Sequence, residues 1–303
     1  MKMTEKKWME IQGIALILLL IVAAVLIPKP ESTKKSSHPT QTTETQIIET
    51  RTTESSTVAP PEKPIFAAEL TKLFDETEGN ASYMFIDLTT NATSYYRPNA
   101  EYFAASTIKV PIVMMLTDKV ASGDLSWTQK VAYTEEDYEE GTGILQNDLQ
   151  DEYTVKELAE VAITQSDNIA KNMLERLLGG REAVRDYIWQ QYLNQNNQTD
   201  ENVITAKQAA TILDYLYQHE EKYADLVKHM QETVFHERLE TTLTKDHLAH
   251  KIGSSESYIH DIGLFLTDQP YVLVVYTDGV GDAEDFISTV SDIVWKAQNP
   301  PNN

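Results

Sequence analysis

The chain of 303 residues contains no cysteine. This absence excludes disulfide bonds, thiolate metal sites and the attachment of a lipid to a cysteine. It also excludes a thiolate nucleophile, so any covalent catalysis by the protein must use another side chain, such as a serine hydroxyl.

Basic residues are scarce as well, because 25 Lys and Arg stand against 47 Asp and Glu and give a formal net charge of −22. Nucleic acids and anionic lipids are themselves negative, so this charge argues against electrostatic binding to either. Metal ligands are not indicated, since the irregular spacing of His236, His247, His250 and His260 matches no metal-binding pattern. We expect no nucleic acid partner, no metal and no cofactor.

The longest apolar run covers residues 13–27 and follows Lys2, Lys6 and Lys7. With the apolar residues just before it, the run approaches the ~20 residues that cross a bilayer, and the lysines favour an N-terminus inside the cell. No small-residue cleavage pattern follows it. The sequence therefore predicts a retained signal anchor over 1–29, which crosses the cell membrane once.

Residues 30–64 are dominated by Thr, Ser, Glu and Pro, a composition that cannot bury a core. We interpret them as a disordered linker across a cell wall, which places the rest of the chain at an outer surface of Gram-positive type. The remaining residues, 65–303, have the length of one domain. We expect this domain to be extracellular and monomeric.

Within 65–303, strand patterns lie at both ends and helical patterns lie between them. We predict a helix over 65–74, strands over 82–88 and 93–96, a long helical middle, a hairpin over 258–277 and a final helix over 284–298. The fold class is therefore α/β of the α+β type. One antiparallel sheet is built from both termini and flanked by helices, with a helical subdomain beside it.

Three short motifs follow one another in this domain: Ser106-Thr107-Ile108-Lys109, Ser166-Asp167-Asn168 and Lys251-Ile252-Gly253. Each is weak alone, and a second Ser-x-x-Lys occurs by chance at Ser32 in the predicted linker. Their order and context are more informative than any one of them.

Pro111 limits where the helix that contains the first motif begins, because proline fits only near a helix start. The first turn should lie at 106–109, where residues three apart share one face, so the Lys109 amine can approach the Ser106 hydroxyl. A buried lysine has a lowered pKa and can act as a base near neutral pH. The alternative is an ordinary capping serine with a surface lysine.

In these motifs the chain resembles the class A β-lactamases and their penicillin-binding relatives, over nearly all of 65–298. The resemblance implies a nucleophile at Ser106, a base at Lys109, a proton relay at Ser166 and an electrostatic role for Lys251. It also implies substrate contacts from Asn168, Gly253 and Ser254, in which the backbone N–H groups of Ser254 and Ser106 form an oxyanion hole.

The chain departs from the family pattern at Ile252, where a threonine or serine hydroxyl usually meets the substrate carboxylate. Arg238 is a candidate to replace that contact with its guanidinium group. A surface arginine without this role is the alternative, and Ser254 or Ser255 could also help.

A second departure concerns the glutamate that activates the deacylating water in class A enzymes. Gln190 stands at the position that echoes it, and an amide cannot accept the proton. We predict instead that 181–193 is a helix and 194–202 a short polar connection, from which Glu201 or Asp200 could still reach the site.

We therefore expect a β-lactamase-like serine hydrolase that forms an acyl-enzyme with β-lactam or D-alanyl amide substrates and deacylates slowly. The same residues would serve a D-alanyl carboxypeptidase or esterase acting on peptidoglycan stem peptides. A sensor module that binds penicillin or wall material without turnover is the third hypothesis.

Overall fold

The computed structural model of the protein describes residues 64–197, 199 and 201–300. The predicted signal anchor over 1–29 and almost all of the predicted linker over 30–64 lie outside these residues. In the part of the chain that is described, no helix is both long and apolar enough to cross a membrane.

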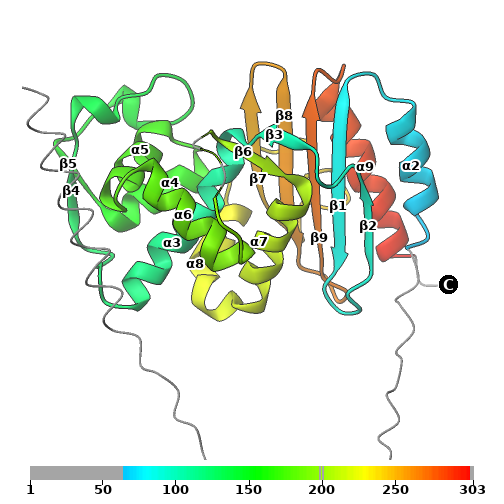
Figure 1. The fold of residues 1–303 in the computed structure, drawn as a ribbon, viewed down its shortest axis with the longest axis horizontal. Helices are drawn as coiled ribbons and strands as arrows, with labels where there is room; N and C mark the ends of the chain where they lie inside the picture. Colours follow the sequence, from blue (N-terminus) through cyan, green and yellow to red (C-terminus); the bar gives the residue numbers. More distant parts are fainter. Residues whose placement is uncertain (1–63, 198, 200, 301–303) are drawn as a thin grey trace, which may run out of the picture. The chain divides into compact units, whose positions relative to one another are not determined.

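A five-stranded antiparallel sheet joins the two ends of the described chain (Figure 1). Its order is β2 (Thr93–Tyr96), β1 (Asn80–Asp87), β9 (Tyr271–Asp278), β8 (Tyr258–Phe265) and β7 (Leu248–Ser255). The predicted sheet built from both termini is confirmed. β7 forms one edge of the sheet, next to the helical part of the domain.

Helices from the two ends of the domain cover one face of the sheet. They are α2 (Ala67–Asp75) and α9 (Ala283–Gln298), which Figure 1 shows beside β1 and β9. Apolar side chains from both helices and from alternate strand positions form a core there, including Leu70, Phe85 and Val290. This alternation follows from the strand repeat, which points successive side chains to opposite faces.

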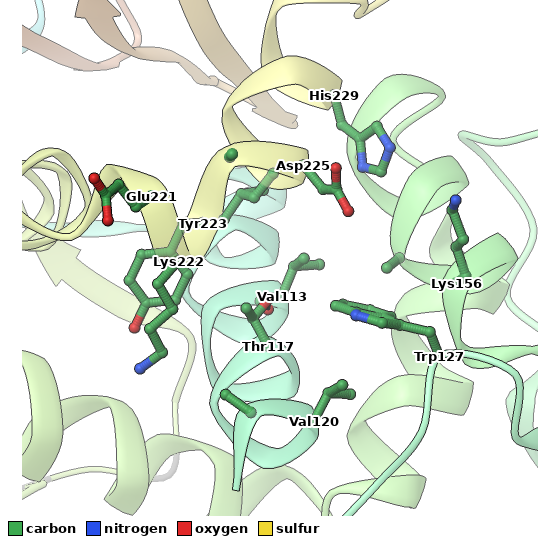
Figure 2. A pocket seen from close by; sticks show the side chains of 14 residues that line it. Val113, Thr117, Val120, Trp127, Lys156, Glu221, Lys222, Tyr223, Asp225 and His229 are labelled. Atoms are coloured by element: carbon green, nitrogen blue, oxygen red, sulfur yellow. Dashed lines mark hydrogen bonds between the residues drawn. The ribbon is translucent and has the colours of Figure 1, made fainter. Parts of the chain in front are cut away.

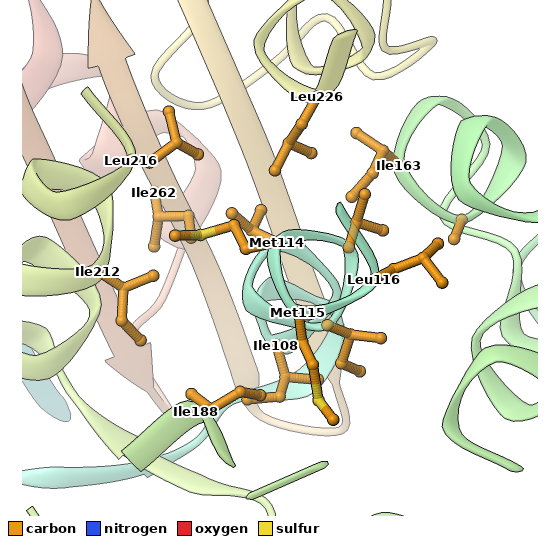
Figure 3. Packing of buried hydrophobic residues seen from close by; sticks show 14 of the residues in the cluster. Ile108, Met114, Met115, Leu116, Ile163, Ile188, Ile212, Leu216, Leu226 and Ile262 are labelled. Carbon is orange, nitrogen blue, oxygen red and sulfur yellow. The ribbon is translucent and has the colours of Figure 1, made fainter. Parts of the chain in front are cut away.

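The other face of the sheet packs against a helical subdomain. It contains α3 (Lys109–Ala121), α4 (Val155–Thr164), α5 (Asn168–Leu177), α6 (Arg181–Leu193), α7 (Ala206–Gln218) and α8 (Glu220–Gln231). Every residue of α3 from Lys109 to Thr117 is buried, and Figure 3 shows apolar side chains of the surrounding elements directed at this helix. A helix that is apolar all round becomes the centre of a core.

Two small two-stranded sheets were not predicted from the sequence. β3 (Glu101–Phe103) pairs with β6 (Val203–Thr205), and β4 (Lys130–Ala132) pairs with β5 (Glu152–Thr154). Strands of three residues are too short to show a repeat, so no local pattern marks them. The β3–β6 pair matters for the site because it brings Asn202, just before β6, next to Ala104 and Ala105, the two residues that precede Ser106.

Candidate active site

Ser106 lies in a 3-10 turn, η1 (Ala105–Ile108), that leads directly into α3. The turn packs against β7 at Gly253, where an added Cβ would lie only 3.0 Å from the carbonyl oxygen of Ala104. Gly253 therefore lets the strand pack closely against the turn that contains Ser106. Its role in substrate binding stays a prediction.

The Lys109 amine joins the first two motifs. Its Nζ lies 3.0 Å from Ser106 Oγ and 3.2 Å from Ser166 Oγ, and it donates to Ser166 O at 2.5 Å and to Asn168 Oδ1 at 2.8 Å. Only 1% of Lys109 is exposed. The predicted approach of this amine to the Ser106 hydroxyl is confirmed, and the surface-lysine alternative is wrong.

The surroundings of Lys109 disfavour its charged form and lower its pKa. Burial lowers the pKa of Lys109 well below 10.5, and the ammonium groups of Lys251 and Lys171 lower it further. The carboxylates of Asp167 and Glu139 act in the opposite direction but do not outweigh these effects. A lowered pKa favours the neutral amine, which is the form that can accept a proton.

The second motif forms the turn between α4 and α5. Ser166 has a left-handed backbone with φ 52°, and Asp167 caps α5 by accepting from the N–H of Ala170 at 2.8 Å. Asp167 also accepts from the N–H groups of Ile144 and Leu145 at 2.7 and 2.8 Å. The buried carboxylate thus fixes both the serine turn and the loop beside it, which agrees with a structural role.

Lys251 lies on β7 with its side chain completely buried. Its Nζ donates to Ile252 O at 3.0 Å and lies 5.5 Å from the centre of the Phe235 ring, and within the described residues it makes no hydrogen bond to either serine. Burial lowers the pKa of Lys251 to about 7, against an opposing effect of Asp261. The positive charge of Lys251 lowers the pKa of Lys109, which is consistent with the electrostatic role predicted for Lys251.

The Arg238 side chain is buried against the end of β7. Only 3% of it is exposed, and its guanidinium donates to Gly253 O at 3.1 Å, to His260 O at 2.9 Å and to Ser254 Oγ at 2.8 Å. An ion pair with Glu284 at 3.0 Å completes its contacts. Arg238 therefore supports the end of β7, where Ser254 and Ser255 line a cavity. Its contact with a substrate stays a prediction.

A cavity of about 600 Å³ opens beside Ser106. Its wall includes Lys109, Asn168, Ser254 and Ser255, as expected from the motifs. It also includes charged side chains that the sequence analysis did not select, on α5, on α6 and on the loop after η2 (Glu135–Asp137): Glu139, Lys171, Glu175, Arg181 and Arg185. No sequence motif marks these residues, because their convergence depends on how the two helices pack.

A second cavity of about 260 Å³ lies between α3, α4 and α8 (Figure 2). Val113, Trp127 and Ala159 form apolar parts of its wall, and His229 lies at its rim. None of the three motifs contributes to it. The cavity beside Ser106 is therefore the candidate active site.

The histidines inside the sheet have structural partners. His260 donates from Nε2 to Phe103 O at 2.9 Å, while its Nδ1 accepts from the N–H of Thr277 at 3.1 Å. Burial lowers the pKa of His260 to about 4, so the ring is neutral and fixed in one tautomer. His250 is paired with Asp261 at 2.8 Å on the opposite face of the sheet.

Curated relatives match part of this domain. A β-lactamase of Bacillus licheniformis is 31% identical over 124 residues, and a β-lactamase of Bacillus subtilis (strain 168) is 34% identical over 112 residues. The first match covers 41% of this chain and 40% of the relative, and the second covers 37% and 35%. The chain thus spans well under half of the length of these relatives.

Solved structures match the domain more completely. PBP-A is similar with a TM-score of 0.72 and 24% identity over 79% of this chain and 98% of that one. A mutant of PBP-A in an acyl-enzyme complex with penicillin G has a TM-score of 0.71 and 25% identity over the same shares of the two chains. An ancestral class A β-lactamase has a TM-score of 0.67 and 24% identity, over 77% of this chain and 99% of that one.

The model of the β-lactamase enzyme family matches residues 65–298. This range contains the whole sheet, the helical subdomain and all three motifs. The chain therefore belongs to the β-lactamase enzyme family.

Proposed function

We propose that the protein is a serine hydrolase that forms an acyl-enzyme on Ser106 with β-lactams or D-alanyl amides. The observation that carries the proposal is the buried Lys109 amine, which lies within 3.2 Å of both serine hydroxyls. One amine in contact with two hydroxyls can take a proton from the nucleophile and return it toward a leaving group. The β-lactamase relatives and the penicillin complex of PBP-A support the substrate class.

In the proposed acylation, Ser106 Oγ forms a bond to the carbonyl carbon while neutral Lys109 takes the hydroxyl proton. The bond between that carbon and the amide nitrogen then breaks, and the nitrogen receives a proton through Ser166. The turn at η1 and the end of β7 offer the N–H groups of Ser106 and Ser254 for the negative charge on the oxygen. The Asn168 side chain lies on the cavity wall, where it can bond the substrate amide.

The full chain treated with a fluorescent penicillin should become covalently labelled on Ser106. Ser106→Ala should abolish labelling, and Ser32→Ala is the matched control, because Ser32 begins the other Ser-x-x-Lys in the sequence. Absence of any adduct on folded protein at millimolar probe would contradict the proposal.

A second candidate is a carboxypeptidase that acts on D-alanyl peptides. It is favoured by the wall of the cavity, where charged side chains of α5 and α6 extend the polar surface beyond Ser106. Faster turnover of an acyl-D-alanyl-D-alanine peptide than of nitrocefin in the same preparation would select it. An adduct that persists for hours with both substrates would select the sensor hypothesis.

A further inference from the structure

The cavity between α3, α4 and α8 is separate from the three motifs and has a volume of about 260 Å³. Its apolar wall is formed by Val113 and Val120 of α3, Ala159 of α4 and the ring of Trp127 (Figure 2). An apolar cavity of ~150 Å³ is enough to take up benzene. This cavity is therefore large enough to hold one apolar side chain of a ligand.

Two groups of opposite charge lie at the mouth of this cavity. Figure 2 shows the Asp225 carboxylate of α8 and the Lys156 amine of α4 around the same open space as the Trp127 ring. Both side chains are exposed, and within the described residues neither forms an ion pair or a side-chain hydrogen bond. One negative and one positive group are therefore available to a ligand at the mouth.

His229 supplies a third polar group, one helical turn after Asp225. Its Nδ1 is buried and has no hydrogen-bond partner in the part of the chain that is described. Burial lowers the pKa of His229 below 6.5, although the carboxylates of Glu160, Asp225 and Glu232 act in the opposite direction. A buried polar atom without a partner costs free energy, and a ligand in the cavity can remove that cost by bonding it.

The other charged side chains of the wall are occupied or directed elsewhere. Lys222 forms an ion pair with Asp118, a carboxylate that also accepts from the Tyr223 hydroxyl at 2.7 Å. Figure 2 shows the Glu221 carboxylate directed away from the open space. The mouth therefore presents one carboxylate and one amine, with an apolar interior behind them.

We infer that this cavity binds a free α-amino acid with an apolar side chain. The ligand's ammonium group pairs with Asp225, its carboxylate pairs with Lys156, and its side chain lies between Val113 and the Trp127 ring. His229 takes one further hydrogen bond from the polar end of the ligand. A zwitterion fits best, because a ligand with a single charge leaves one of the two mouth groups without a partner. This site goes beyond the proposed function and does not depend on it.

The test is a titration of the full chain with L-phenylalanine and with D-phenylalanine, followed by ¹⁹F NMR after labelling with 5-fluorotryptophan. The chain contains four tryptophans, and Trp127→Phe identifies the signal of Trp127. With at least one of the two probes, the Trp127 signal should shift and saturate while the other three signals stay in place. This pattern locates the ligand in the cavity between α3, α4 and α8.

Two analogues test the role of each charge at low ionic strength. Phenethylamine lacks the carboxylate and 3-phenylpropanoate lacks the ammonium group, so each should bind at least about threefold more weakly than phenylalanine. Asp225→Asn should weaken the binding of phenylalanine and phenethylamine by a similar factor but not that of 3-phenylpropanoate. Lys156→Gln should weaken the binding of phenylalanine and 3-phenylpropanoate but not that of phenethylamine.

The matched controls are Glu220→Gln and Lys207→Gln, since both residues are exposed and lie outside the cavity wall. They should leave the binding of all three compounds unchanged. No shift of the Trp127 signal at about 10 mM of either phenylalanine would overturn the inference. Equal binding of phenylalanine and its two analogues would also overturn it, because the cavity would then select for apolar character alone.

Discussion

The two faces of strand β7 carry buried basic residues whose pKa values are shifted in opposite directions. His250 and Lys251 are neighbours in the chain, and only 1% and 0% of them are exposed. Burial with help from Arg238 lowers the pKa of Lys251 to about 7. Burial also disfavours charge on His250, but Asp261 and Glu240 outweigh it and raise the pKa of His250 to about 9.

The difference teaches that burial alone does not decide which base is neutral. His250 Nδ1 is in direct contact with the Asp261 carboxylate at 2.8 Å, whereas the Lys251 amine donates to the carbonyl oxygen of Ile252 at 3.0 Å. Since strand residues alternate between faces, one step along β7 separates these environments. The face toward α3 carries an amine whose pKa is lowered, and the face toward α9 carries a histidine whose pKa is raised by carboxylates.

The largest effect that would test the comparison is expected on the α3 face. Lys109→Met should slow acylation of Ser106 by about 100-fold to 10,000-fold, because it removes the base. The free energy of unfolding should not fall, since a buried amine is replaced by an apolar side chain of similar length. Stopped-flow labelling and urea unfolding measure the two quantities. Fast acylation by this variant would show that another group takes the proton.

On the α9 face, the charge on His250 should make stability depend on pH. Because its pKa is raised from 6.5 to about 9, its contribution is complete below pH 6.5 and is lost as the pH rises through about 9. The loss should amount to about 3 kcal/mol of unfolding free energy. Urea unfolding across this range measures it.

Asp261→Asn is the variant that sharpens this prediction, because it removes the charge that His250 faces while preserving shape. Its unfolding free energy should be lower at pH 6.5 and should change less with pH. An unchanged pH dependence would mean that His250 is not the titrating group. Asp261→Asn should slow the acylation of Ser106, measured per folded molecule, less than Lys109→Met does.

The smallest effect is expected from Lys251→Met. The Lys251 ammonium helps to lower the pKa of Lys109, so its removal should raise that pKa and move the acid limb of the acylation profile to higher pH. Acylation should become several-fold slower below neutral pH and change less above it. Lys245→Met, at an exposed lysine before β7, is the control. A shift to lower pH would contradict the coupling between the two amines.

Much of the fold could be predicted from local patterns. The helix over 181–193 and the hairpin over 258–277 agree with α6, β8 and β9. Helix and strand repeats are properties of neighbouring residues, so these elements are visible in the sequence. The short pairs β3–β6 and β4–β5 were missed, because their strands are defined only by partners about 100 and about 20 residues away, respectively.

The candidate active site could likewise be predicted only in part. The spacing of Ser106 and Lys109 predicted their contact, since three residues along a helical turn fix it. The contacts of Arg238 could not be predicted, because nothing local shows that its guanidinium is enclosed by β7, β8 and α9. The place of Glu201 on the cavity wall depends on Asn202 and on the nucleophile turn, which lie far apart in the chain.

The sequence by itself determined the negative charge, the absence of thiol chemistry, the helices and long strands, and the side chains able to serve as nucleophile and base. Only the tertiary structure decided which of those side chains are buried and which carboxylates face them. The reason is that backbone preferences act between neighbours, whereas the solvation and charge of a side chain depend on contacts between residues distant in the chain.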